Sequence, residues 1–136
     1  MIMYEIIVFT HGLLGRELVS TAGLILGEHD EIKVFAVMPG CDLGQLKSQV
    51  SEAIRIQAEK SKNVLVLTDL LYGTPFNMVS SLRETYDFRH ITGTNLTMLM
   101  EAINRKESTT ETLDDALPEI LNTTREGIIS VDDLFS

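Results

Sequence analysis

The chain has 136 residues, one cysteine, 44% hydrophobic residues and a formal net charge of −9 at pH 7. This length and composition predict a single domain over residues 1–136, with a sizeable buried core. The acidic balance argues against nucleic acid as a partner. The lone cysteine excludes an internal disulfide and a cysteine-rich zinc site.

No apolar run approaches the roughly 18 residues of a membrane helix, and the N-terminus has no basic signal-peptide region. We therefore expect a cytoplasmic protein. Short apolar runs alternate with helical patterns along the chain. Strands are predicted at 4–10, 32–38, 63–69 and 90–93, and helices at 13–26, 42–60, 75–86, 97–105 and 112–126. Pro118 should kink or split the last helix, and residues 128–131 are predicted to form a final short strand.

Alternation of strands and helices predicts right-handed βαβ units. The expected fold is a doubly wound α/β domain, with a mostly parallel sheet of order 2-1-3-4 and helices on both faces. Such sheets bind ligands beyond the carboxyl ends of their strands, where the strand order reverses. The residues that follow each strand are therefore the candidates for chemistry.

Two strand ends carry unusual polar residues. His11 follows the first strand, and Asp69 ends the third, its neighbour in this order. A neutral imidazole nitrogen is a nucleophile towards phosphorus, and a carboxylate can fix the tautomer and stabilise the charge that develops on the ring. The pattern predicts that His11 carries a phosphoryl group and that Asp69 orients its ring. Gly12 would leave room for a partner to approach.

A helix start follows Asp69. Thr74 is predicted as the N-cap and Pro75 as the first helical residue, with Gly73 just before them. Helix N-termini favour anions, so we expect Gly73 and Thr74 to bind the phosphate. We find neither a Walker loop nor a GxGxxG motif, and we predict no metal or other cofactor. The other histidines are interpreted as exposed in a turn (His29) and structural (His90).

The fragments that surround these residues resemble a known family, the mannose-type IIA domain of the bacterial phosphoenolpyruvate-dependent sugar phosphotransferase system. The resemblance covers essentially the whole chain, and it depends on the order and spacing of several short motifs. These are Thr10-His11-Gly12, Leu26-Gly27-Glu28, Pro39-Gly40, Asp69 before Gly73-Thr74-Pro75-Phe76-Asn77, Gly93-Thr94-Asn95-Leu96, Met98-Leu99 and Arg125-Glu126-Gly127.

The resemblance implies that His11 accepts a phosphoryl group from the phosphocarrier HPr on Nε2 and passes it to a histidine of a IIB component. The IIC and IID membrane components would then import and phosphorylate a sugar. It also implies that Asp69 holds the other ring nitrogen and that Thr74 contacts the histidine or the phosphate. The family further implies a homodimer in which the strand at 128–131 crosses to the partner subunit.

The chain departs from the family pattern beside the site. Tyr72 stands where the family often has a small residue, and Leu71 replaces a familiar aromatic. These departures bear on the choice of partner and sugar more than on the chemistry.

Two alternatives stay open. The domain also resembles the phosphocarrier subunit of dihydroxyacetone kinase, in which the phosphate goes to a nucleotide on another protein. It resembles domains of transcriptional regulators as well, but a chain of this length without a DNA-binding segment disfavours that role. The second alternative is a flavodoxin-like binding module without phosphoryl transfer. No phosphate-binding loop follows the first strand and the chain has no tryptophan, which disfavours a flavin site.

Overall fold

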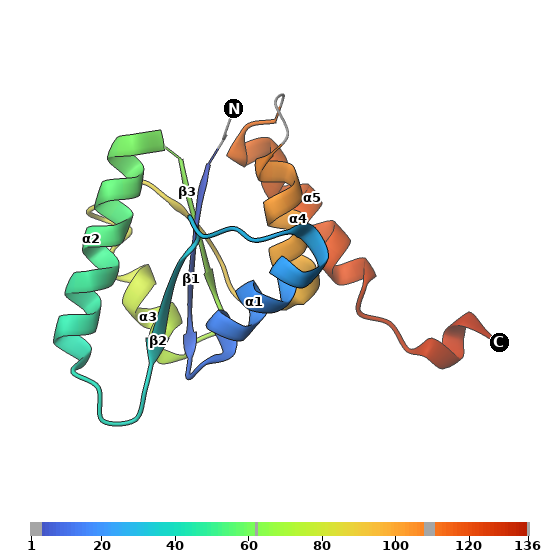
Figure 1. The fold of residues 1–136 in the computed structure, drawn as a ribbon, viewed down its shortest axis with the longest axis horizontal. Coiled ribbons are helices and arrows are strands. Elements are labelled where there is room, and N and C mark those ends of the chain that lie inside the picture. The colour runs from blue at the N-terminus through green and yellow to red at the C-terminus, as the bar shows by residue number, and fades with distance from the viewer. Residues whose placement is uncertain (1–3, 62, 108–110, 136) are drawn as a thin grey trace.

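The fold, seen in a computed structural model that describes residues 4–61, 63–107 and 111–135, places a central sheet between two layers of helices (Figure 1). The strands are β1 (Glu5–His11), β2 (Lys33–Val37), β3 (Val64–Thr68) and β4 (Arg89–Ile91). The helices are α1 (Leu14–Leu26), α2 (Leu43–Ser61), α3 (Thr74–Ser80), α4 (Leu96–Lys106), α5 (Leu113–Glu126) and the short 3₁₀ helix η1 (Val131–Leu134).

The sheet has the order β2-β1-β3-β4, and its paired strands are parallel. The predicted order 2-1-3-4 and the α/β class are therefore confirmed. β1 lies between β2 and β3, with Phe9 opposite Thr68 in register. This register brings the carboxyl ends of β1 and β3 to the same edge of the sheet.

Side chains of alternate strand residues enter two separate cores, as the twofold repeat of a strand requires. Ile6, Val8 and Leu67 pack with α1, α4 and α5 on one face. Ile7, Phe9 and Val66 pack with α2 and α3 on the other face. His11 continues the odd-numbered set of β1, which faces α2 and α3, so its side chain emerges on the α3 side of the sheet.

The helix after Pro75 is shorter than predicted, because α3 ends at Ser80 rather than near Tyr86. Beyond it the chain makes turns in which N–H groups bond to carbonyls three residues earlier: Leu82 to Val79, Arg83 to Ser80 and Thr85 to Leu82. An α-helix needs bonds four residues back, so the polar segment that looks helical in sequence becomes a series of turns.

Pro118 does not split the last helix. α5 is assigned as one helix from Leu113 to Glu126, with Pro118 inside it. The helix buries Leu113, Ala116 and Ile120 in the core that contains α4. Packing of this apolar face stabilises the helix across the position where proline removes one backbone hydrogen bond.

The predicted last strand is wrong for the single chain. Residues 128–130 have no regular structure, and Val131 begins η1. This segment leads away from the sheet (Figure 1), and a strand forms only where a neighbouring strand supplies its hydrogen bonds. The exchange of this segment between two subunits stays a prediction.

The interpretation of His29 as solvent-exposed is also wrong. Its side chain is only 12% exposed. Its ring nitrogens lie 3.0 Å from Glu31 Oε1 and 3.5 Å from Glu107 Oε1. The turn folds back beside the end of α4, a tertiary contact that a local sequence pattern does not predict.

Candidate functional site

His11 and Asp69 lie side by side at the carboxyl edge of the sheet. Asp69 Oδ2 accepts a hydrogen bond from the His11 backbone N–H at 3.0 Å and also lies 3.0 Å from the ring Nδ1. The His11 side chain is 46% exposed, whereas that of Asp69 is only 9% exposed. An ionised carboxylate only accepts hydrogen bonds, so Nδ1 carries the proton. The lone pair of the ring is then on Nε2.

The electrostatics of Asp69 favour its ionised form. Burial alone would raise the pKa of Asp69, but hydrogen bonds from the His11 backbone and ring hold this pKa below its ordinary value. Its second oxygen, Oδ1, is buried and has no hydrogen-bond partner among the residues that the structure describes. The hydrogen bonding of this carboxylate is thus concentrated on His11.

Gly73 lies against the edge of the imidazole. A Cβ built on Gly73 would come within 2.8 Å of His11 Cε1 and 3.2 Å of the Leu70 carbonyl oxygen. Its φ of −74° is open to any residue, so the need for glycine here is one of space. The structure therefore brings the predicted residue Gly73 beside His11.

Thr74 differs from its predicted role at the helix start. Gly73 is the N-cap, and Thr74 is the first residue of α3. The Gly73 carbonyl accepts the first helical bond, from the Asn77 N–H at 2.9 Å. The Gly73 N–H closes a turn onto the Leu70 carbonyl, also at 2.9 Å. This turn ends the loop one residue earlier than predicted and takes Thr74 into the helix.

The loop between Asp69 and Gly73 is held in an uncommon conformation at Tyr72. Tyr72 has φ +66°, in the left-handed region that side chains disfavour. The Asn77 Nδ2 group donates to the Tyr72 carbonyl at 3.1 Å. The Tyr72 ring packs edge-on against Phe76. Sequence reasoning singled out Tyr72 only as a departure and gave Asn77 no role. The departure at Tyr72 from the pattern that the resemblance implies was the available signal.

Two features of the β1–α1 turn fix the backbone at His11. Gly12 has φ +54°, with open space where a Cβ would stand, and its N–H donates to the Val37 carbonyl at 2.8 Å. Buried Thr10 donates through Oγ1 to the His11 carbonyl at 3.2 Å and accepts from the Gly15 N–H at 2.7 Å. The backbone at His11 is therefore fixed from β2 and from α1.

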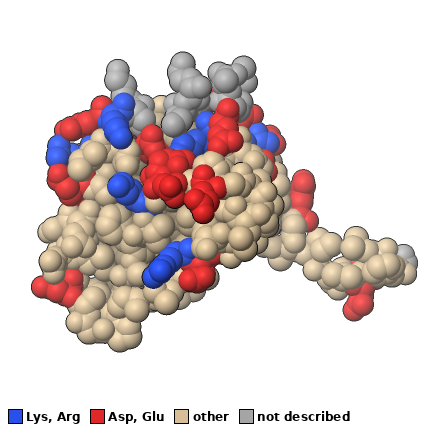
Figure 2. All heavy atoms as spheres, viewed as in Figure 1, with Lys and Arg blue, Asp and Glu red and all other residues tan. Residues whose placement is uncertain are grey.

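The surface beside His11 is apolar. Leu13 and Leu14 after β1, and Leu70, Leu71 and Tyr72 after β3, are all exposed. Charged side chains gather in the upper part of the view in Figure 2, whereas the lower part, where β1 ends in Figure 1, is mostly uncharged. This site is suited to contact with a protein surface.

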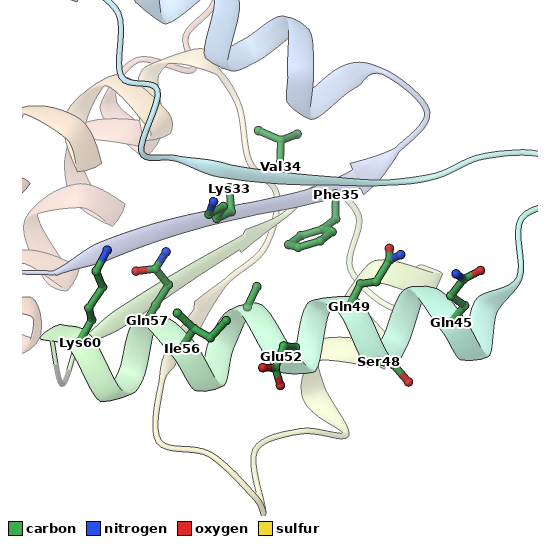
Figure 3. Close-up of a pocket in the computed structure, with 11 residues that line it drawn as sticks. Lys33, Val34, Phe35, Gln45, Ser48, Gln49, Glu52, Ile56, Gln57 and Lys60 are labelled. Atoms are coloured by element: carbon green, nitrogen blue, oxygen red, sulfur yellow. The ribbon is translucent and has the colours of Figure 1, made fainter.

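A separate groove of about 710 Å³ lies between β2 and α2 (Figure 3). Phe35 points from β2 towards the helix, and Gln57 and Lys60 lie at one end. The groove runs along the side of the sheet, and none of the predicted site residues lines it.

Among the described residues, no three His, Cys, Asp or Glu side chains could together hold a metal ion. In that same part of the chain, none of the helices has the length and apolar character needed to cross a membrane.

Comparison with known proteins identifies the family and the fold. Residues 5–134 match the family model described as the PTS system fructose IIA component, EIIA-man. The chain belongs to the EIIA-man family. Members are components of a sugar phosphotransferase system, and membership supports a phosphocarrier role for this chain.

Two similar proteins show how far the likeness extends. The mannose-specific EIIAB component of Escherichia coli (strain K12) is 29% identical over 126 residues, which is 90% of this chain and 38% of that protein. The fructose-specific EIIA component of Bacillus subtilis (strain 168) is 27% identical, with 88% of this chain and 78% of that protein covered. The chain thus spans well under half of the EIIAB protein.

Solved structures have the same fold as this EIIA-man chain. A phosphotransferase system EIIA component from Streptococcus agalactiae is 32% identical, with a TM-score of 0.80 and coverage of 96% of this chain and 99% of that one. The IIA protein associated with the fucose utilization operon of Streptococcus pneumoniae has a TM-score of 0.85 over the whole of both chains. At 24% identity that likeness concerns the fold alone.

Proposed function

We propose that this chain is a phosphocarrier that accepts a phosphoryl group from phospho-HPr on His11 Nε2 and passes it to a IIB component. The observation that carries the proposal is the double contact of Asp69 Oδ2 with the His11 backbone N–H and ring Nδ1. This contact assigns the proton to Nδ1 and leaves the lone pair on Nε2, which supports Nε2 as the nucleophile. The exposure of the ring supports access by a partner.

The transfer balances without a cofactor. The Nε2 lone pair attacks the donor's phosphorus, and the P–N bond to His11 forms as the donor's bond to phosphorus breaks. The His11 ring becomes positively charged, and the ionised Asp69 stabilises that charge through Nδ1–H. In the second transfer the acceptor's nucleophile attacks the same phosphorus, and the P–N bond to His11 breaks.

Gly73 and Thr74 are proposed to contact the phosphoryl group. Gly73 lies closest to Cε1, the ring carbon between the two nitrogens, and Thr74 follows it with a hydroxyl that can donate to a phosphate oxygen. We further propose that residues 1–136 act as one IIA domain in a homodimer. The IIC and IID membrane components would act downstream of IIB.

Intact-mass spectrometry tests the proposal directly. The purified chain is incubated with phosphoenolpyruvate, enzyme I and HPr, beside the variants His11→Ala and His29→Ala. We expect a single acid-labile phosphoryl group on the wild type and on His29→Ala, and none on His11→Ala. His29 is a matched control because it lies in the turn before β2, away from the carboxyl ends of the strands where His11 and Asp69 lie.

Each other outcome has a distinct meaning. Phosphate that persists in His11→Ala would place the carrier on another residue. No phosphorylation of folded wild type would remove the transferase role and favour a binding module. If phosphorylated chain donates to a dihydroxyacetone kinase and not to a IIB protein, the donor step stands and the proposed acceptor is wrong.

A further inference from the structure

A buried polar network lies behind Asp69, at the junction of β3 and β4. Thr68, the residue directly before Asp69, is fully buried. Its Oγ1 lies 2.8 Å from His90 Nε2 and 2.9 Å from Thr92 Oγ1. Its carbonyl oxygen accepts from the Thr94 N–H at 3.1 Å and from the Thr94 hydroxyl at 2.6 Å. The hydroxyl and the carbonyl of Thr68 are therefore both held from the β4 side.

The hydrogen bonds of this network run in one direction. Thr68 Oγ1 donates to Thr92 Oγ1, whose own hydroxyl points to the Thr68 carbonyl at 3.5 Å. A hydroxyl has one proton to donate, so in this arrangement, with Thr68 Oγ1 donating to Thr92, the hydrogen bond from His90 is the one that Thr68 Oγ1 accepts. His90 is thus the donor, through Nε2–H, and it begins the chain of bonds that ends at the peptide preceding Asp69.

His90 also supports the other wall of the site. Its ring packs against Phe76 of α3, with ring centroids 5.3 Å apart, and Phe76 in turn contacts Tyr72 at 5.5 Å. Phe76 lies three residues after Gly73, the residue whose missing Cβ makes room for the His11 ring. One side chain therefore contacts both the strand end that carries Asp69 and the helix start that carries Gly73.

We infer that His90 is a positioning residue for phosphoryl transfer, which holds Thr68 and Phe76 and thereby sets Asp69 and Gly73 against the His11 ring. This inference rests on the proposed function of His11. It goes beyond that function because His90 does not contact the imidazole. Displacing a nucleophile by even 1 Å can lower the reaction rate about a hundredfold. Holding Asp69 and Gly73 in place beside the His11 ring therefore matters to the reaction.

The charge state of His90 agrees with this role. Burial, together with the positive charge of Arg83, lowers the pKa of His90 to about 4. The ring is therefore neutral near pH 7, with a single N–H that is used on Thr68. A neutral ring keeps the donor without placing another charge behind Asp69.

Three variants separate the two contacts of His90. His90→Phe keeps a ring for Phe76 and removes the hydrogen bond. His90→Gln keeps an N–H donor at a similar reach and removes the ring. Thr68→Val deletes the hydroxyl from the other end of the bond with little change in shape. His29→Gln is the control, since that histidine lies in the turn after α1 and has no contact with this network.

Two readouts are measured on each folded protein: the nitrogen-15 NMR spectrum of the His11 ring without phosphate, and the rate of phosphoryl uptake from phospho-HPr. We expect His90→Phe and Thr68→Val to lose Nδ1–H tautomer at His11 and to react about tenfold more slowly. His90→Gln should remain closer to wild type in the NMR spectrum. Denaturant unfolding of each variant reports its stability separately.

The inference is overturned if His90→Phe and Thr68→Val keep the wild-type His11 tautomer, whatever their stability. It is also overturned if both react within about twofold of wild type. Should one of the two fail to fold, the other decides. If wild type itself takes no phosphate from HPr, the proposed function fails, and the NMR spectra alone decide whether His90 positions the ring.

Discussion

The imidazole of His11 is bounded on two edges by residues that leave it little freedom. Asp69 Oδ2 holds Nδ1, and Gly73 lies beside Cε1. The third edge, with Nε2, is left for the reaction. A change at Gly73 therefore tests how the ring and the phosphoryl group proposed beside it respond to crowding, while His11 and Asp69 themselves stay unchanged.

Gly73→Ala should slow phosphoryl uptake by about tenfold while the free energy of unfolding changes by less than about 1 kcal/mol. The added methyl group would lie 2.8 Å from Cε1. The exposed ring can move away at little cost to the fold, but moving stretches its bond to Asp69. The φ of −74° accepts alanine without strain. Stopped-flow kinetics and urea unfolding measure the two quantities.

Gly44→Ala is the matched control for this prediction. A Cβ on Gly44, near the start of α2, would meet only the Asp42 side chain, at an ordinary 3.4 Å. The control should keep the wild-type rate. Equal rates for wild type and Gly73→Ala would show that the ring tolerates displacement.

The central pair of the site was predictable from sequence, because parallel strands end at one edge and neighbouring strand ends must meet. The placement of Thr74 inside α3 was not, since it depends on the turn from Gly73 to Leu70. The sequence predicts a structural His90 but does not indicate the positioning role that we propose for it. Thr68 and Thr92 look like ordinary strand residues, and their link to His90 appears only when β3 and β4 pair.

At the scale of elements, α1 begins without a side-chain cap of its own. Its N-cap is Leu13, whose side chain makes no capping hydrogen bond to the first turn. Instead, Thr10 at the end of β1 accepts the Gly15 N–H at 2.7 Å. Gly15 allows this approach, because a Cβ there would lie 3.0 to 3.2 Å from Val8 and Thr10 side-chain atoms. The strand thus caps the helix that follows it.

Thr10→Val should lower the free energy of unfolding by about 1–2 kcal/mol, the usual effect of losing a cap with a buried N–H left unpaired. It should also slow phosphoryl uptake, since the Thr10 hydroxyl donates to the His11 carbonyl. Urea unfolding and uptake kinetics measure the two effects.

Thr112→Val provides the comparison. Thr112 caps α5 by accepting the Asp115 N–H at 3.2 Å, away from the site. The Thr112→Val variant should lose about 1 kcal/mol in free energy of unfolding and keep the wild-type rate of phosphoryl uptake. If both variants slow uptake equally, the effect reflects general stability rather than the β1–α1 junction.

Elements with a strong apolar pattern were predicted to within one or two residues at each end, as for β1 and α1. The failures lie where local pattern and tertiary contact disagree. The sequence after Ser80 is compatible with a longer helix, yet α3 ends there and the chain turns. By contrast, α5 continues through Pro118 because its apolar face is packed.

At the scale of the whole molecule, the C-terminal segment after α5 is an apolar arm, defined here as residues 128–135. It extends from the body of the fold (Figure 1). Its Ile128, Ile129, Val131, Leu134 and Phe135 are all exposed, as are Leu24 and Ile25 of α1. A single chain rarely leaves so many large apolar side chains in water without a partner to cover them.

Deletion of residues 128–136 should convert a dimer into a monomer, because it removes the apolar surface that a second subunit would cover. Light scattering coupled to gel filtration measures the mass of each form. Ile129→Glu with Val131→Glu should act in the same way, since burial of unpaired carboxylates is costly. Ser130→Glu, in the same arm, is the milder control. A full-length chain that stays monomeric at high concentration would contradict the proposed homodimer.

The use of one Asp69 oxygen for both the backbone and the ring of His11 has a thermodynamic consequence. The two hydrogen bonds close a small loop through the histidine, so its rotamers are restricted before any partner arrives. Ordering a side chain costs on the order of 1 kcal/mol of conformational entropy. Here that loss occurs once, during folding. Under the proposed function, neither the donor nor the acceptor would then need to supply it, and one fixed geometry would serve both uptake and release of the phosphoryl group.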